Sequence, residues 1–325
     1  MLVNSDDSEP WTCIKCNLDG INYVNNSCEY YDSSLFNSNN FDNKSLSFLH
    51  LNISSSDKHF DNFGAFLNKL NHSFKVIGIT ESRIKSVGID FPILNYETFH
   101  TPTEADAGGT SLYILKDLKP SRRKDLESQL YVPKTLESTF GEITSGSNCF
   151  IIGTVYKHPF MKINDFLSFL GPVIDKINCE GKSLILLGDF NIDLLKFNAD
   201  PSVFKFLDTL GSYSLKPYIN KPTRITENSK SLIDNIFISS IPCSASSGNF
   251  LTGLSDHLIQ FTVLKNSFFK PDASIKYYKD WKKFDSFNFC NKFNNFEWIE
   301  AMQLDKKNPE LSFSIFYEKI NCMIN

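Results

Sequence analysis

Short apolar segments alternate with segments of helical periodicity along residues 45–267 of this chain. Apolar or alternating runs of about four to eight residues are typical of β-strands. The runs are LSFLHLNI (46–53), VIGIT (76–80), SLYIL (111–115), FIIGTVY (150–156), SLILLG (183–188), LIDNIFIS (232–239) and LIQFTVL (258–264). Because several are apolar at almost every position, we expect sheets that are covered on both faces.

Three segments between these strands have the spacing of amphipathic helices. Pro172 lies within the second helix and should weaken or kink it. The third has Asp200 as its N-cap and Pro201 at the first helical position. Helices between buried strands predict an α/β fold. The apolar positions are Phe60, Phe63, Leu67 and Leu70, then Phe166, Leu170, Val173 and Ile177, then Phe204, Leu207 and Leu210.

The two ends of the chain differ from this central region. Residues 1–44 are rich in Asn, Ser and Asp and have no sustained period, which predicts a flexible segment. Cys13 and Cys16 form a CxxC pair there, but only Cys28 lies near as a third ligand, and structural zinc takes four. We expect no zinc at Cys13 and Cys16. Residues 268–325 predict a helical, linker-like tail, so residues 45–267 form the main domain.

Composition excludes several classes of protein. A content of 41% hydrophobic and 14% aromatic residues is too high for a mainly disordered chain. No apolar run approaches the roughly 18 residues that cross a bilayer, and the acidic N-terminus lacks the apolar core of a signal peptide. The eight cysteines are scattered, which favours reduced thiols. We expect a soluble, intracellular protein of the nucleus or cytoplasm that binds no membrane.

The charge of the chain gives no general attraction to nucleic acid, because the net charge is −4. Binding to DNA would therefore depend on local basic patches. One candidate is KPSRRK at residues 119–124, and the other consists of Lys221, Arg224 and Lys230 around a predicted turn.

Polar side chains stand where the predicted strands begin or end. In a mixed sheet, the end of one strand and the start of its antiparallel neighbour lie at the same edge. We therefore expect these side chains to converge on one cleft above the core. Asn52, Glu81, Tyr156, Asp189 and Asn191 follow or close strands, and Asp256 and His257 precede one.

These residue types suit phosphodiester hydrolysis with Mg²⁺, for which Mn²⁺ is the alternative. The hard cation takes oxygen ligands such as Glu81, Asp256 and the amide oxygen of Asn52 or Asn191. An aspartate can deprotonate water, and a histidine can donate to phosphoryl oxygens. Asp234 lies in an apolar strand and needs a partner, so we expect it to hold that histidine. No small-molecule cofactor is expected.

Six short motifs carry a resemblance to a known family. LNI, TES, YKHP, GDFN, the PTR to SLIDNIF segment and LSDH occur in that order within residues 45–267. Their order and spacing resemble those of the endonuclease/exonuclease/phosphatase superfamily. GDFNIDLL, the PTR turn and LSDHLIQF are similar to the apurinic-type endonuclease domain of LINE-like (non-LTR) retrotransposons.

The resemblance implies a four-layer αββα sandwich of the DNase I-like type, with a short helical C-terminal extension. It implies metal-site roles for Asn52, Glu81 and Asp256. It also implies that Asp189 activates water, that Asn191 and Tyr156 contact the phosphate, and that Asp234 orients His257, which stabilises the transition state. The residues implied to line the DNA side of the pocket are Thr223, Arg224 and Ser231.

The leading hypothesis is a Mg²⁺-dependent DNA endonuclease that nicks one strand and leaves a 3′ hydroxyl. Two alternatives stay open: a phosphatase or phosphodiesterase acting on a small phosphoester, and a non-catalytic nucleic-acid-binding remnant. The stretch TEADAGGTSLYIL departs from the resemblance, because it is acidic and has only Gly108 and Gly109 where related domains have three glycines. The chain shows no complete zinc finger and no polymerase motif, so we expect a retroelement fragment or a gene derived from one.

Overall fold

The computed structural model describes residues 28–86, 91–145, 148–239, 244–265, 285–296, 298 and 315–320, and also strands β1 (Leu2–Val3) and β2 (Thr12–Cys13), which pair with each other. The chain divides into two compact units, Met1–Lys270 and Pro271–Asn325. The second unit contains α6 (Ser286–Asn294) and a helical segment at residues 315–320. Among the described residues, no helix has the length and apolar character needed to cross a membrane.

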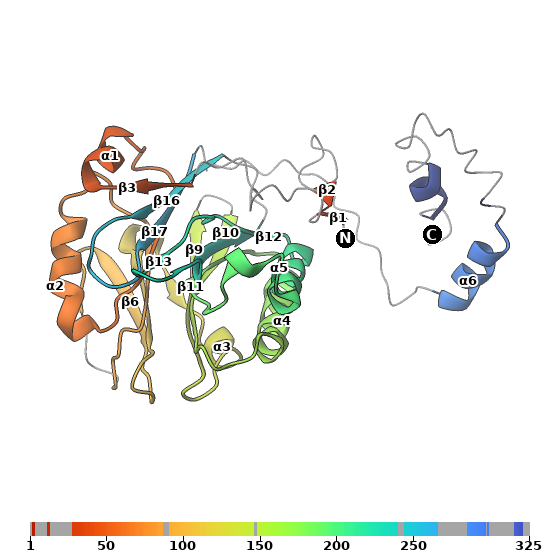
Figure 1. The fold of residues 1–325 in the computed structure, drawn as a ribbon, viewed down its shortest axis with the longest axis horizontal. Coiled ribbons are helices and arrows are strands. Elements are labelled where there is room, and N and C mark those ends of the chain that lie inside the picture. Colours follow the sequence, from red (N-terminus) through yellow and green to blue (C-terminus); the bar gives the residue numbers. More distant parts are fainter. Residues whose placement is uncertain are drawn as a thin grey trace. The chain divides into compact units, whose positions relative to one another are not determined.

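Two β-sheets form the centre of the first unit (Figure 1). The seven-stranded sheet has the order β3-β16-β17-β4-β5-β7-β6, and the six-stranded sheet has the order β12-β15-β11-β10-β9-β8. The strands of the first are β3 (Cys28–Tyr31), β4 (Ser47–Asn52), β5 (Val76–Thr80), β6 (Tyr96–Thr101), β7 (Thr110–Leu115), β16 (Ala245–Phe250) and β17 (Ile259–Leu264). Those of the second are β8 (Ser121–Arg122), β9 (Leu136–Ser145), β10 (Asn148–Lys157), β11 (Ser183–Asp189), β12 (Leu215–Pro217) and β15 (Asp234–Ser239).

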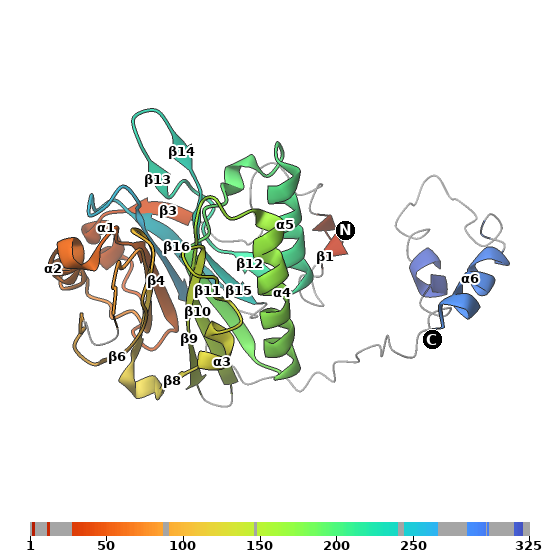
Figure 2. The same ribbon diagram turned by 90° about the horizontal axis from the view of Figure 1, so that it is seen from below.

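Helices cover the outer face of each sheet (Figures 1 and 2). Helices α1 (Ser33–Ser38) and α2 (Ser56–Leu67) cover the seven-stranded sheet, and α3 (Lys124–Glu127), α4 (Ile163–Cys179) and α5 (Pro201–Ser212) cover the other. Three buried clusters fill the spaces between these layers. In β11, Leu184 and Leu186 face the helices, whereas Ile185 and Leu187 face the other sheet. The predicted αββα sandwich and its helical C-terminal extension are confirmed.

Each predicted strand and helix is present, with bounds that differ by a few residues. Pro172 lies inside α4 without interrupting it, and the Asp200 carboxylate accepts from the Ser202 backbone N–H at 2.8 Å, as expected of an N-cap. Strand β9 was not predicted, because Glu137 and Thr139 are fully buried between the sheets and give the segment a polar sequence. Because buried positions of β9 are polar, the strand lacks the apolar run by which the other strands were predicted.

Residues 28–44 differ from the expected flexible segment. Strand β3 pairs in parallel with β16, and α1 buries Phe36 completely against the rings of Phe74, Phe250 and Phe261. The isolated aromatic residues of this segment have no period, so only tertiary packing reveals their burial. The side chains of residues 13 and 16 lie outside the described residues, and Cys28 is a buried free thiol.

Candidate active site

Strand directions bring the predicted residues to one edge of the sandwich. Strands β4 and β5 are parallel and end at the same edge, and β17 starts there because it is antiparallel to β4. Strands β10 and β11 likewise end together, and β15 starts beside them. Asp189 and Asp234 are therefore direct partners across two adjacent strands.

Asn52 links two carboxylates that belong to different sheets. Its side-chain NH₂ donates to Glu81 Oε1 at 3.0 Å and to Asp189 Oδ2 at 2.9 Å, and its Oδ1 accepts from the Ser54 backbone N–H at 3.1 Å. This pattern fixes the amide orientation, because the NH₂ group is donor only. Asn52 was predicted to offer oxygen to a metal, whereas here it presents NH₂ to the two carboxylates. The Tyr156 hydroxyl also donates to Glu81 Oε1, at 3.0 Å.

Asp189 is a carboxylate with neutral partners. Besides Asn52, its hydrogen-bond donor is the Asn191 backbone N–H, at 2.9 Å from Oδ1. Asn191 has a left-handed φ of 47°, which asparagine tolerates better than most residues, and its side chain donates to the Lys157 carbonyl at 2.9 Å. Burial, and then the charge of Asp234, raises the pKa of Asp189 to about 7. The group can therefore accept a proton near neutral pH.

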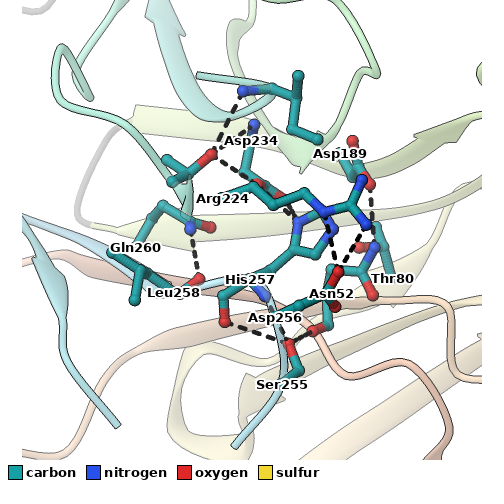
Figure 3. Close-up of polar contacts among 12 residues, drawn as sticks. Asn52, Thr80, Asp189, Arg224, Asp234, Ser255, Asp256, His257, Leu258 and Gln260 are labelled. Carbon is teal, nitrogen blue, oxygen red and sulfur yellow. Dashed lines mark hydrogen bonds and ion pairs between the residues drawn. The ribbon is translucent and has the colours of Figure 1, made fainter. Parts of the chain in front are cut away.

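Asp234 and His257 form a buried pair (Figure 3). His257 Nδ1 lies 2.9 Å from Asp234 Oδ2, and the Thr223 hydroxyl donates to the same oxygen at 2.7 Å. Burial acts to lower the pKa of His257, but the charge and hydrogen bond of Asp234 outweigh it and raise that pKa to about 9. Burial acts to raise the pKa of Asp234, but His257 outweighs it, so that pKa lies below its usual range. The pair is ionised, and Nδ1 donates to the carboxylate.

A second layer of polar residues, which the sequence did not reveal, supports this pair. His50 is fully buried in β4, with Nδ1 2.6 Å from Gln260 Oε1 and Nε2 3.1 Å from Thr80 Oγ1. His50 Nδ1 also lies 4.0 Å from Asp234 Oδ1. Burial lowers the pKa of His50. In the sequence, His50 occupies an ordinary core position of an apolar strand, so no local signal distinguishes it.

Ser255 joins the loop before β17 to the end of β4. Its hydroxyl lies 2.8 Å from the Asn52 carbonyl oxygen, to which it can donate, and it accepts from the His257 backbone N–H at 3.0 Å. This contact connects the Asn52 group to the Asp234 and His257 pair. It was not predicted, although Ser255 lies within the LSDH motif.

The residues predicted to face DNA divide into two groups. Arg224 and Ser231 pair in the hairpin of β13 (Arg224–Ile225) and β14 (Lys230–Ser231), which stands out from the sandwich (Figure 2). Arg224 Nη2 lies 2.7 Å from Asp256 Oδ2, and both side chains are about half exposed. Thr223 is fully buried and bonded to Asp234, so its side chain does not line an open surface.

Several residues of the predicted basic patches pair with acidic neighbours. Arg123 pairs with Asp125, Glu142 and Glu180, and Arg122 pairs with Glu127. Lys221 pairs with Glu29. The segment at residues 119–124 therefore offers less free positive charge than its sequence suggests.

No protein-family model matches this sequence, and no curated protein matches it by sequence either. Solved structures do match. The endonuclease domain of TRAS1, a telomere-specific non-LTR retrotransposon, has a TM-score of 0.50 at 16% identity, over 68% of this chain and 98% of that one. The human Nocturnin catalytic domain has a TM-score of 0.50 at 15% identity, over 68% of this chain and 93% of that one. The 3′-5′ exonuclease NExo of Neisseria meningitidis has a TM-score of 0.51 at 15% identity, over 67% of this chain and 98% of that one.

This chain has the endonuclease/exonuclease/phosphatase fold. Among the described residues, one group at the site edge of that fold has ligand atoms close enough together to hold a cation. Ligand atoms of Asp189, Asp234 and His257 lie within 4.8 Å of one another. In that set, Asp234 and His257 Nδ1 are already bonded to each other. Glu81 and Asp189 instead accept from neutral donors of Asn52, and such carboxylate oxygens are the ligands that Mg²⁺ prefers.

Proposed function

We propose that this chain is a phosphodiesterase that depends on Mg²⁺ or Mn²⁺, and that it nicks one strand of DNA to leave a 3′ hydroxyl. The observation that carries the proposal is the pair of aspartates on β11 and β15. Asp189 and Asp234 lie opposite each other with pKa values displaced in opposite directions. Two neighbouring acids tuned in this way can divide the roles of proton acceptor and permanent anion.

Asp189 takes the role of general base. A pKa raised to about 7 lets it orient a water molecule and remove its proton near neutral pH. The two carboxylate oxygens of Asp189 have different donors. Oδ1 accepts from the Asn191 backbone N–H, and Oδ2 accepts from the Asn52 side-chain amide. Asn191 and Tyr156 lie at the same edge, and their side chains, which here donate to the Lys157 carbonyl and to Glu81, take the role of phosphate contacts in this proposal.

His257 takes the role of donor to the phosphoryl oxygens. Asp234 holds Nδ1, so the protonated ring presents its other N–H, at Nε2. Thr223 contributes by fixing Asp234 and not by contacting substrate. Glu81, whose carboxylate is held by the Asn52 amide, would hold Mg²⁺, and Asp256 is the further oxygen ligand in this proposal. The ion would neutralise charge that develops on the phosphate and the leaving oxygen.

Two features favour a polymeric substrate over a small phosphoester. The hairpin of β13 and β14 carries Arg224 beside the site. A pocket of about 360 Å³ adjoins Asn191 and has room for a neighbouring phosphate of a strand, and its lining includes Lys157 and Lys162 beside one acidic residue, Asp200. The likeness to the TRAS1 endonuclease domain supports DNA as that strand.

The test is nicking of supercoiled plasmid by the full chain with Mg²⁺ or Mn²⁺. We expect open-circular product whose ends a DNA polymerase extends, because the cut leaves a 3′ hydroxyl. Asp189→Ala and His257→Ala should abolish nicking, whereas Asp61→Asn and His59→Ala on α2 should not. Nicking that survives both site substitutions, or no nicking with either metal, contradicts the proposal. Faster turnover of small phosphoesters than of plasmid would favour the alternative substrate.

A further inference from the structure

Glu137 is a buried carboxylate behind the site that none of the roles above uses. It lies in β9 directly opposite Tyr156 in the sheet, and its side chain has no exposed surface. The Thr103 hydroxyl donates to Oε1 at 2.5 Å, and the Gly109 backbone N–H donates to Oε2 at 2.5 Å. A buried carboxylate is costly unless it is hydrogen-bonded, and these two donors offset that cost. Glu137 therefore anchors the loop between β6 and β7.

The same loop holds the backbone that follows Glu81. The Gly109 carbonyl accepts from the Ser82 N–H at 3.2 Å, and the Gly108 carbonyl accepts from the Arg83 N–H at 2.8 Å. Glu81 and Arg83 have left-handed φ values of 51° and 56°, which side chains of this kind seldom adopt. Such a conformation persists only where its surroundings enforce it. The loop held by Glu137 provides that enforcement.

Gly108 and Gly109 allow the loop between β6 and β7 to lie close to both Glu137 and the backbone after Glu81. A Cβ atom at Gly108 would lie 2.4 Å from Glu137 Oε2, and one at Gly109 would lie 2.5 Å from Ser82 Oγ. Both glycines also have positive φ values, of 125° and 82°. The paired glycines therefore fit between Glu137 and the Glu81 segment.

Glu137 is connected to Tyr156 by a second route. His158 Nε2 lies 3.8 Å from Glu137 Oε2, and the His158 ring packs edge-on against the Tyr156 ring at a centroid distance of 4.6 Å. His158 is buried, and among the described residues its Nε2 has no hydrogen-bond partner, so the carboxylate is its polar neighbour. Glu137 thus supports both members of the hydrogen bond from Tyr156 to Glu81.

We propose that Glu137 is a positioning residue that sets the geometry of Glu81 and Tyr156 and, through them, the affinity of the site for its divalent cation. This inference rests on the proposed function, because it takes Glu81 as a metal ligand. Glu137 touches neither the cation nor the substrate. Groups that hold a metal ligand in place typically change affinity or activity by roughly 10- to 100-fold when they are removed.

The experiment measures Mn²⁺ binding to the full chain by electron paramagnetic resonance, together with hydrogen exchange at Ser82 and Arg83. Glu137→Ala should weaken Mn²⁺ binding by roughly tenfold or more and speed exchange of both amides. Glu137→Gln keeps the shape and one acceptor, so it should restore most of the affinity. The matched control is Glu142→Gln, on the same strand, whose carboxylate pairs with Arg123 and Lys182.

If Glu137→Ala does not fold, Thr103→Val removes one bond to the same carboxylate and should show the same changes to a smaller degree. In nicking assays the folded variants should lose kcat, with little change in KM for DNA. Wild-type affinity and wild-type exchange in a folded Glu137→Ala protein overturn the inference. A wild-type protein that binds no Mn²⁺ and nicks no DNA overturns both proposals, whereas an active wild type beside unchanged variants overturns only this one.

Discussion

Asp189 and Asp234 have the same position in two adjacent strands but very different surroundings. Both are buried, with 1% and 0% of their surface exposed. Asp234 receives His257 and the Thr223 hydroxyl, whereas Asp189 receives only a backbone N–H and the Asn52 amide. The partner, and not the depth of burial, therefore decides which carboxylate keeps its charge.

The comparison shows how one sheet edge can supply both a base and an anion. A charged, hydrogen-bonded partner lowers the pKa of Asp234, and burial without such a partner raises the pKa of Asp189. The first carboxylate stabilises the folded state by pairing. Asp189, in contrast, destabilises the folded state when it is charged, although its raised pKa lets it act as a base. Loss of the charge should therefore lower stability at Asp234 and raise it at Asp189.

The largest effect is expected from Asp189→Asn. The isosteric amide cannot accept a proton from water, so kcat for plasmid nicking should fall by about 10³-fold. The thermal midpoint should rise, because the substitution removes a charge that is unfavourable in this buried position. Calorimetry and nicking rates check both parts, with Asp61→Asn as the control. A lower thermal midpoint would contradict the proposed difference between the aspartates.

Asp234→Asn should lose both activity and stability. The variant leaves the His257 charge buried without its partner, which typically costs about 3 kcal/mol or more. Urea unfolding monitored by circular dichroism measures the free energy of unfolding. A variant as stable as wild type would show that the pair contributes nothing to the folded state.

The pH dependence of stability should separate the two groups. The pKa of Asp189 is about 7 in the folded protein, and that of an unfolded aspartate is about 4. The protonated group therefore contributes stability below about pH 4, and this contribution is lost as pH rises through about 7. The advantage of Asp189→Asn over wild type should accordingly grow across this range. Metal-free urea unfolding at several pH values checks this, and a constant difference would contradict it.

The contribution of the His257 charge should also be lost as pH rises, but over a more alkaline range. The pKa of His257 is about 9 in the folded protein, and that of an unfolded histidine is about 6.5. The contribution of its charge is complete below about pH 6.5 and is lost as pH rises through about 9. The stability deficit of Asp234→Asn should therefore shrink at alkaline pH. A deficit that does not change with pH would show that His257 is not charged in the folded state.

Thr223→Val tests whether this residue acts through Asp234 or through the substrate. Loss of its hydrogen bond should cost about 1 kcal/mol of stability. We expect kcat to fall several-fold and KM for DNA to stay unchanged, because the side chain is buried beneath the site. An increase in KM with unchanged kcat would instead support the contact with DNA that the sequence suggested.

The smallest effect is expected from Arg224→Gln. Its ion pair with Asp256 is exposed and should contribute less than about 1 kcal/mol to stability. Loss of the guanidinium should weaken DNA binding and modestly strengthen Mn²⁺ binding, because Asp256 is released. Titrations of both ligands, with Lys58→Gln on α2 as the control, check the two directions. Weaker Mn²⁺ binding would contradict this assignment.

The sequence predicted much of the fold because its two sheets are buried on both faces. Strands such as β5 and β11 are continuously apolar, and the polar residues at their ends mark where each strand leaves the core. Strand β9 and residues 28–44 were missed for opposite reasons. Glu137 gave a buried strand a polar sequence, and Phe36 was an isolated aromatic residue in a polar segment.

The sequence by itself pointed to several of the residues that meet at the site, because Asp189, Asp234 and His257 stand at or near the ends of apolar strands. Only the tertiary structure decided what each of them does. The pKa of Asp189, the amide orientation of Asn52 and the support of Glu81 by Glu137 depend on partners from distant segments. Burial and hydrogen bonding set protonation and geometry, and both arise only when the two sheets pack together.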